Sequence, residues 1–348
     1  MKHNNFITNQ FIQSMKSLFI SFALLVSLSS FAQKLTPAEL KQFRTREDSL
    51  KTFGYEMVRG KDAAVRFRSD SNFTRVLVRA IIQDKSFQYP FDSLKTISKI
   101  YSEDSSFRIF TWQVVKDDDY CRQKGFIQFR NPKAGEKFIP LRDADQFIAN
   151  DVDTIANNMW WIGAVYYRMI EKEFNGKKYY TLFGYDENDN RTTKKWLDVM
   201  WFDENEKPVF GQQGVFSFAQ DSVPKPATNR FLLEYKKDGR ARVQYDEEMD
   251  MIIFDHLVSE TSEPGKKYTL IPDGDYEGFK WENGQWQHID KVFNFKLEDG
   301  QAPVPEAIDF NNRLLKGEII EEAPPTAPKQ QPQKKPVAKP PVKKKTGN

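Results

Sequence analysis

Proton transfer near neutral pH is the first chemistry to look for, and the residues that could perform it are few. His256 and His288 are the only histidines after the N-terminal segment, and histidine is the side chain best suited to this role. Asp255 precedes His256 in an alternating apolar run, Met251–Leu257, where successive side chains point to opposite faces of a strand. We therefore predict that Asp255 and His256 do not pair. His256 stands as a weak candidate for ligand binding, or as the base for a distant serine, although no G-x-S-x-G sequence accompanies it.

Metal binding through oxygen ligands is the second chemistry. Asp186, Asn188 and Asn190 alternate as oxygen ligands do at the start of a calcium loop. The similarity then ends, because Arg191 and Leu197 stand where that loop has glycine and glutamate. A polar turn between two strands explains these residues equally well. The sequence requires no cofactor, and calcium at these three positions is the alternative that stays open.

Aromatic side chains could bind sugar rings or a protein surface, and the chain has seven tryptophans. Trp160 and Trp161 are adjacent, so in an extended segment they point to opposite faces and one can be exposed. They are the other candidate ligand-binding residues. Metal sites built from Cys and His, and phosphate-binding glycine loops, are absent from the sequence. We name no catalytic residue, and Cys121, the single cysteine, excludes an intramolecular disulfide.

Two helices are expected in an N-terminal region, 33–96. Thr36 and Glu39 match a capping box, with Pro37 at the first helical position. A second helix is predicted from Asn72 to Gln83 by apolar residues at helical spacing.

From about Ile97 the apolar period changes to two, and ten runs between Phe107 and Val292 are typical of strands. Three hairpins are predicted where turn dipeptides separate such runs, at Asn175-Gly176, Asp238-Gly239 and Asn283-Gly284. The predicted fold class is mainly β (α+β): an antiparallel β-meander over 97–320, built as a sandwich or open barrel. A propeller is less favoured because no repeat of about 40 residues is visible.

The N-terminus predicts export. Lys16 precedes an apolar run, Leu18–Leu28, that is shorter than the roughly 20 residues of a membrane-spanning helix. Ser30-Phe31-Ala32 follows as a cleavage site, so residues 1–32 are expected to be a signal peptide, with 1–14 as an upstream extension if translation starts at Met15. The protein is expected in the periplasm or at the cell surface, with no transmembrane segment after cleavage.

The C-terminal segment, 321–348, is expected to be a disordered tail, because it is rich in Pro and Lys and nearly free of apolar residues. Seven lysines and no acid follow Glu322 and two lysines precede Gln33, so the net charge of +3 leaves −6 for Gln33–Glu322. An acidic body is a poor match for nucleic acid. The tail could contact an anionic surface and act as a tether, through the lysines at Lys334, Lys335, Lys343, Lys344 and Lys345.

Four blocks resemble a group of exported proteins of Bacteroidota: Phe107–Trp112, Tyr179–Tyr185, Phe202–Gly211 and Phe254–Leu257. The resemblance spans roughly Ile97 to Val292. It implies a compartment and no mechanism, and no functional residue follows from it.

Three functions are consistent with these features. The leading hypothesis is a non-catalytic envelope protein whose β body binds a protein or glycan partner. The alternative is a hydrolase that acts on envelope or extracellular polymer through paired carboxylates, which leave little trace in a linear sequence. The third is a calcium-stabilised structural protein.

Overall fold

The structure, a computed structural model, describes residues 34–117, 119–132 and 136–293. The predicted signal peptide and the tail with its five tether lysines lie outside the described residues. The chain divides into two units, Met1–Asn294 and Phe295–Asn348, and every described residue belongs to the first. Among these residues, no helix combines the length and the apolar character needed to cross a membrane.

Two long helices, α2 (Pro37–Arg59) and α3 (Ala63–Ile81), are followed by the short 3-10 helix η1 (Ser86–Gln88). The capping box is confirmed: the Thr36 hydroxyl accepts from the Glu39 N–H, and the Glu39 carboxylate accepts from the Thr36 N–H. α3 begins nine residues before the predicted Asn72, with Asp62 as its cap. Its first turns were missed because they carry polar residues on the buried side, among them Asp70.

Three sheets follow. The first has the order β1 (Ser98–Tyr101), β2 (Phe107–Asp117), β3 (Tyr120–Phe129) and β4 (Phe138–Arg142), all antiparallel. The second has the order β5 (Ala156–Asn157), β9 (Pro208–Phe210), β8 (Thr192–Phe202), β7 (Lys177–Asp186) and β6 (Val165–Phe174), with β12 (Arg230–Lys236) also paired to β8.

The third sheet has the order β11 (Lys225–Thr228), β10 (Phe216–Phe218), β16 (Gln285–Ile289), β15 (Leu270–Glu282), β14 (Met251–Ser259) and β13 (Val243–Asp246). One pairing in it, between β10 and β16, is parallel. Two short 3-10 helices, η3 (Asp145–Phe147) and η4 (Lys267–Thr269), lie in the connections.

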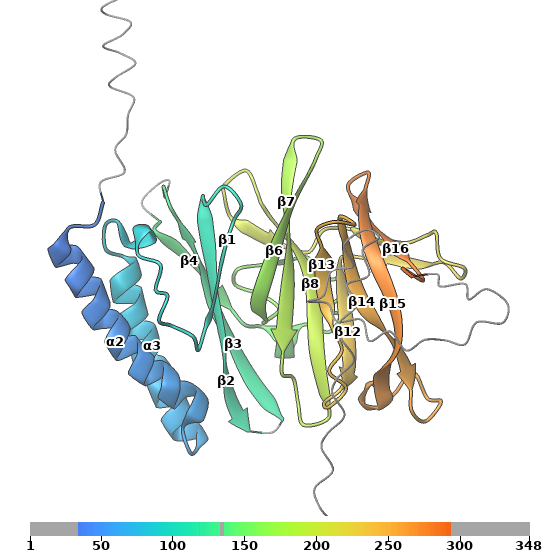
Figure 1. The fold of residues 1–348 in the computed structure, drawn as a ribbon, viewed down its shortest axis with the longest axis horizontal. Coiled ribbons are helices and arrows are strands. Elements are labelled where there is room, and N and C mark those ends of the chain that lie inside the picture. The colour runs from blue at the N-terminus through green and yellow to red at the C-terminus, as the bar shows by residue number, and fades with distance from the viewer. Residues whose placement is uncertain (1–33, 118, 133–135, 294–348) are drawn as a thin grey trace, which may run out of the picture. The chain divides into compact units, whose positions relative to one another are not determined.

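The helices and the three sheets stack as four layers (Figure 1), with one apolar core between each neighbouring pair. Both faces of the first and second sheets are therefore buried. On β2, Phe107 and Ile109 face the second sheet, while Phe110 and Trp112 face the helices. The prediction of a mainly β fold behind two helices is confirmed, in the form of stacked open sheets.

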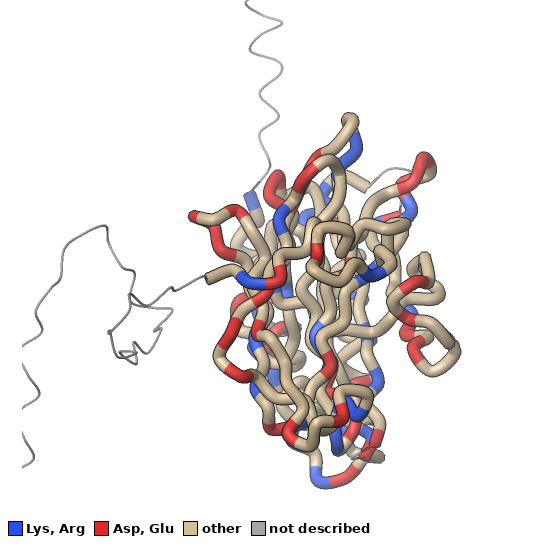
Figure 2. The backbone as a smooth tube through the Cα atoms, turned by 90° about the vertical axis from the view of Figure 1, so that its right-hand side faces the viewer, with Lys and Arg blue, Asp and Glu red and all other residues tan. Residues whose placement is uncertain are grey.

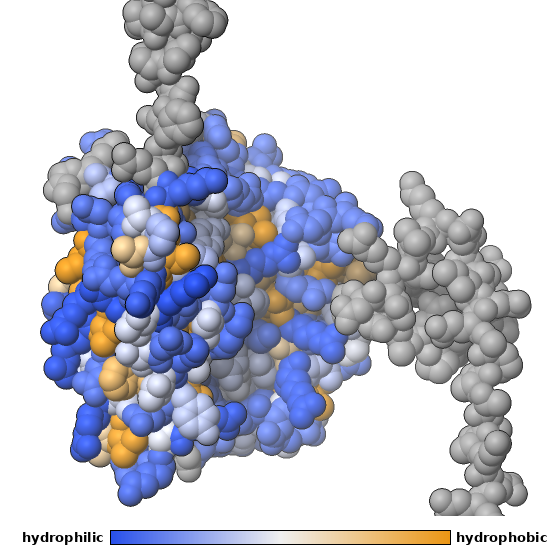
Figure 3. Space-filling model, turned by 60° about the vertical axis from the view of Figure 1, so that its left-hand side comes forward, coloured by the Kyte–Doolittle hydropathy of each residue, from blue (hydrophilic) through white to orange (hydrophobic). Residues whose placement is uncertain are grey.

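The outer side of the helices is mostly polar. On the face shown in Figure 3, hydrophobic side chains are visible as small separate areas among hydrophilic ones. Tyr55 and Val58 are the exposed large hydrophobic residues of α2. Scattered exposure of this kind is normal for a protein surface.

Two of the three predicted hairpins are confirmed and one is wrong. Asn175-Gly176 joins β6 to β7 and Asn283-Gly284 joins β15 to β16, with positive φ at all four positions. Asp238-Gly239 does not join a hairpin, because β12 pairs with β8 and β13 pairs with β14. The chain crosses there from the second sheet to the third, and Leu233 and Tyr235 of β12 are buried in the core between them.

Candidate functional site

A cleft of about 470 Å³ opens between α3, the first sheet and the turn that contains η3. This volume is within the usual range for ligand sites. Its apolar lining comes from four elements, with Leu77 and Val78 on α3, Trp112 on β2, Phe126 on β3, and Phe138, Pro140 and Leu141 on β4.

Basic side chains line the same cleft. Lys124 pairs with Asp70, a buried carboxylate that also accepts a hydrogen bond from the Trp112 indole at 2.9 Å. Arg142 has no ion-pair partner in the part of the chain that the structure describes. The Arg142 guanidinium is therefore available to a ligand, whereas Lys124 is held by Asp70.

Two carboxylates, Asp143 and Asp145, complete the polar lining. Burial raises the pKa of both above the ordinary aspartate value. Asp143 accepts hydrogen bonds from the backbone N–H groups of Gln123 at 2.9 Å and Asp145 at 3.1 Å. Asp143 thus holds the turn in place, and Asp145 is the carboxylate better placed to meet a ligand.

Gln123 connects this cleft to the second sheet. Its side-chain N–H donates to Asp186 at 2.8 Å. Asp186 is buried, and burial raises its pKa to about 6. The same carboxylate accepts from the Asn188 N–H at 2.9 Å, and the Asn188 amide donates to Thr192 at 2.6 Å.

The residues of the calcium hypothesis therefore lie in a hydrogen-bonded turn between β7 and β8. Asp186 is buried, Asn188 is half-buried and Asn190 is exposed. The turn is accounted for by its own hydrogen bonds, as the polar-turn interpretation requires. Calcium there stays a prediction.

The connection from β4 to β6 carries a run of exposed hydrophobic residues. Phe147 is 76% exposed and Trp160 is 55% exposed, with Ile155 and Met159 also exposed between them. The N–H of Arg142 donates to the carbonyl of Asn158 at 2.7 Å, and the N–H of Trp161 donates to the carbonyl of Arg142 at 3.0 Å. Met159 and Trp160 therefore lie beside the end of β4, next to the cleft, and Phe147 lines the cleft itself.

The two adjacent tryptophans differ in exposure, although the chain at Trp160 forms a turn and not the extended segment on which the prediction of alternation rests. Trp161 is fully buried, and its indole N–H donates to the Tyr166 hydroxyl at 2.8 Å. Trp160 is the exposed member, so it alone can meet a partner. Its role in binding stays a prediction.

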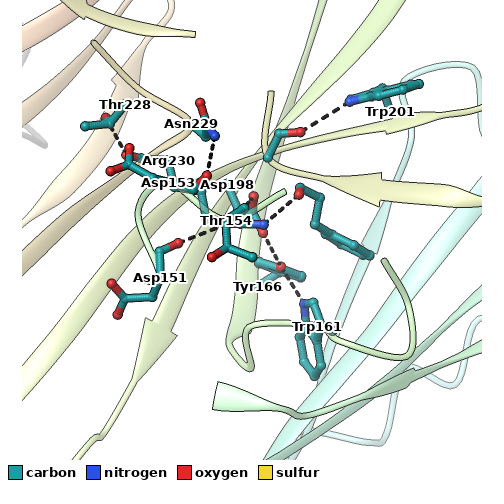
Figure 4. A network of polar contacts seen from close by, with 12 residues as sticks. Asp151, Asp153, Thr154, Trp161, Tyr166, Asp198, Trp201, Thr228, Asn229 and Arg230 are labelled. Atoms are coloured by element: carbon teal, nitrogen blue, oxygen red, sulfur yellow. Dashed lines mark hydrogen bonds and ion pairs between the residues drawn. The ribbon is translucent and has the colours of Figure 1, made fainter. Parts of the chain in front are cut away.

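A buried polar network holds the part of this connection that lies between Phe147 and Ile155 (Figure 4). The Arg230 guanidinium is fully buried and donates to Asp198 at 2.8 Å and to the Phe210 carbonyl at 2.6 Å. It also donates to the carbonyls of Asp151, at 2.9 Å, and Thr154. A side chain of β12 thereby holds the loop before Ile155 against the second sheet.

Sequence reasoning missed this network. Its two charged members each interrupt an apolar strand, Asp198 within Trp196–Trp201 and Arg230 at the start of β12. A charge inside a strand that is otherwise buried is the signal that could have found them, because such a charge needs a partner.

His256 and Asp255 do not pair, as predicted. The His256 ring is 2.9 Å from Asp273 through Nδ1 and 3.6 Å from Glu277 through Nε2. Asp255 accepts from the Arg242 N–H at 2.7 Å, and burial raises its pKa. His256 lies on the third sheet, away from the cleft between α3 and the first sheet.

Comparison of this chain with protein-family models, with curated proteins and with solved structures found no match. The function has to be argued from the site.

Proposed function

We propose that this chain is an exported, non-catalytic binding module, and that the cleft with its exposed hydrophobic segment binds a protein partner of the cell envelope. The observation that carries the proposal is that exposed Phe147 lines the cleft, while exposed Trp160 lies in the segment bonded to the end of β4 beside it. Export and the resemblance to a group of exported proteins of Bacteroidota belong to the same proposal and rest on the N-terminal segment and the sequence blocks.

The chemistry of the surface favours a protein over a glycan. Aromatic residues, Met and Arg are enriched in the buried centres of protein interfaces. Arg142 and Phe147 line the cleft, and the backbone next to Met159 and Trp160 bonds to Arg142. An extended stretch of a partner can place one side chain in the cleft and lie across the exposed segment.

Site-specific photo-crosslinking in intact cells tests this proposal. A photoreactive amino acid is placed at Phe147, at Trp160, or at the control position Val223, which is 73% exposed in the loop after β10. The expected result is one protein crosslinked from both 147 and 160 and not from 223. Glycan adducts at 147 and 160 would show the other class of partner, and identical crosslinks from all three positions would contradict the site.

A second candidate function, hydrolysis through carboxylates, draws on Asp143 and Asp145. Both lie in a cleft lined by aromatic rings, and burial raises the pKa of both, which suits a general acid. Envelope and extracellular polymers are the substrates to screen, with Asp145→Asn as the variant. Turnover that is lost in Asp145→Asn would favour the hydrolase, and absence of turnover in the native chain would remove it.

A further inference from the structure

The third sheet holds a second cluster of functional groups, formed by Asp221, His288 and Asp290. His288 lies on β16, Asp290 follows that strand, and Asp221 lies in the loop after β10. One ligand atom from each lies within 4.8 Å of the others. It is the only group of three such side chains found among the described residues.

The spacing of the donor atoms fits one bound ion. His288 Nδ1 is 2.8 Å from an Asp221 oxygen and 3.4 Å from an Asp290 oxygen. Two donors that each lie about 2.1 Å from a metal are about 3.0 Å apart in octahedral geometry and about 3.4 Å apart in tetrahedral geometry. The three atoms lie within 4.8 Å of one another, and an ion placed among them would replace the hydrogen bond between His288 Nδ1 and Asp221.

Neighbouring groups hold the three side chains in position. The other ring nitrogen of His288, Nε2, is 2.9 Å from Glu277, the arrangement in which a carboxylate orients a metal-binding histidine. The second oxygen of Asp290 accepts from the Ser222 N–H at 3.0 Å and from its hydroxyl at 3.1 Å. The rings that pack around the imidazole are Phe218, Phe254 and Phe279.

Charge gives an independent reason for a cation. Three carboxylates, on Asp221, Glu277 and Asp290, surround one imidazole. With His288 protonated the group still carries a net charge of −2. Asp221 and His288 are 8% and 5% exposed, while the excess negative charge lies on Glu277 and Asp290, whose side chains are 23% and 47% exposed and so can meet a cation from solvent. Acidic residues are also frequent in the loops on this side of the molecule (Figure 2).

We propose that Nδ1 of His288 and the carboxylates of Asp221 and Asp290 bind a divalent transition-metal ion, with Zn²⁺ as the best match to one imidazole and two carboxylates. The ion joins the loop after β10 to the end of β16 and so closes one end of the third sheet. His288 is then neutral and donates its Nε2–H to Glu277. Three protein ligands leave a fourth position for water or for a group from a partner.

Metal content and affinity of the full-length, tag-free protein test the proposal. The protein is stripped with a chelator and dialysed against Zn²⁺, and metal per chain is measured by plasma mass spectrometry. Affinity is measured by competition with a chromophoric chelator. We expect one Zn²⁺ per chain and a melting temperature that rises with Zn²⁺ and falls again with chelator.

Three variants make the test specific. Asp290→Asn removes a ligand that is half-exposed, and we expect it to weaken Zn²⁺ binding at least 10-fold while the chain stays folded. Ser222→Ala should weaken binding about 10-fold, the low end for loss of a group that orients a ligand. The matched control is Asp275→Asn, since Asp275 is an exposed carboxylate of the same sheet that pairs with Lys291 at 3.1 Å.

Each outcome decides the matter. Stoichiometric Zn²⁺ that is weakened by Asp290→Asn and not by Asp275→Asn supports the site. Equal affinity in Asp290→Asn and the native protein would overturn it, as would a failure of the native protein to retain Zn²⁺. Retention of Ca²⁺ in place of Zn²⁺ would also overturn the assignment.

Discussion

At the scale of single residues, the ion pair of Arg230 and Asp198 is the contact on which the loop before Ile155, beside the cleft, depends most. Both side chains are buried, so removal of either one leaves the buried charge of the other without a partner. We expect Arg230→Ala to lower the free energy of unfolding by about 3–5 kcal/mol, the usual cost of breaking a buried pair. Urea denaturation measures it.

The control is Arg168→Ala, because Arg168 pairs with Glu247 at the surface. We expect it to cost about 0–1 kcal/mol, as exposed pairs do. Equal losses of unfolding free energy in the two variants would show that the buried network at Arg230 stabilises the fold no more than an exposed ion pair does.

Asp186 gives a prediction about pH. Burial raises its pKa from 3.8 to about 6, so between these values the folded state binds more protons than the unfolded state. The protonated Asp186 carboxyl therefore makes its whole contribution to the free energy of unfolding below pH 3.8. That contribution is lost as the pH rises through 6. Asn cannot ionise, so Asp186→Asn should gain stability over the native protein between pH 4 and pH 7, by up to about 3 kcal/mol.

Unfolding by urea at pH 4, 5, 6 and 7 measures this effect. The control is Asp189→Asn, because backbone N–H groups of the same turn bond the Asp189 carboxylate and its pKa is lowered. The stability that ionised Asp189 contributes is fully present above pH 3.8, so that variant should be less stable than the native protein by a nearly constant amount from pH 4 to pH 7. Parallel pH curves for native protein and Asp186→Asn would contradict the prediction.

At the scale of elements, the turn between β15 and β16 also joins two layers. Gly284 has φ of +81°, and a Cβ there would run into the ring of Phe174, at the end of β6 in the second sheet. Gly176 has φ of +73° and open space around it. Gly284→Ala should therefore cost more than Gly176→Ala, since both pay about 1–2 kcal/mol for a left-handed residue and only the first adds overpacking of about 1–3 kcal/mol.

Thermal and urea denaturation of the two glycine variants measure that difference. Because the two turns share the Asn-Gly sequence, the comparison isolates the contact with Phe174. Equal destabilisation would mean that the ring moves aside freely.

Local signals account for the elements that the sequence predicts well. The Thr36–Glu39 capping box and the two Asn-Gly turns are set by neighbouring residues, so they can be recognised without the fold. The failures are non-local. β12 pairs with β8, 32 positions apart at Arg230 and Asp198, and a turn dipeptide carries no information about that choice.

The candidate sites could not be predicted from the sequence for the same reason. Asp221 and His288 are 67 positions apart in the chain, and the fold brings them together through the parallel pairing of β10 with β16. Trp160 could be named from the sequence because a pair of adjacent tryptophans is a local feature, whereas the cleft beside it needs α3, β3 and β4 in place.

At the scale of the whole chain, charge separates the tail from the rest. The segment after Glu322 carries seven lysines and no acid, while Gln33–Glu322 carries −6. We expect the tail to hold the protein at an anionic envelope surface, with about 1 kcal/mol for each lysine that lies near it. Deletion of Ala323–Asn348 should therefore release the protein from the envelope fraction.

Fractionation of cells in buffers of increasing salt measures the release, and the control replaces the seven lysines with Gln while all prolines stay. An electrostatic tether predicts that the Gln variant is released like the deletion, and that the native protein is released as salt shortens the screening length. Retention of both variants would place the attachment in the β body, where the cleft beside Phe147 and Trp160 is the first surface to test. Release of the deletion alone would instead assign the tail's role to its prolines, because an extended proline-rich segment can be recognised without its charge.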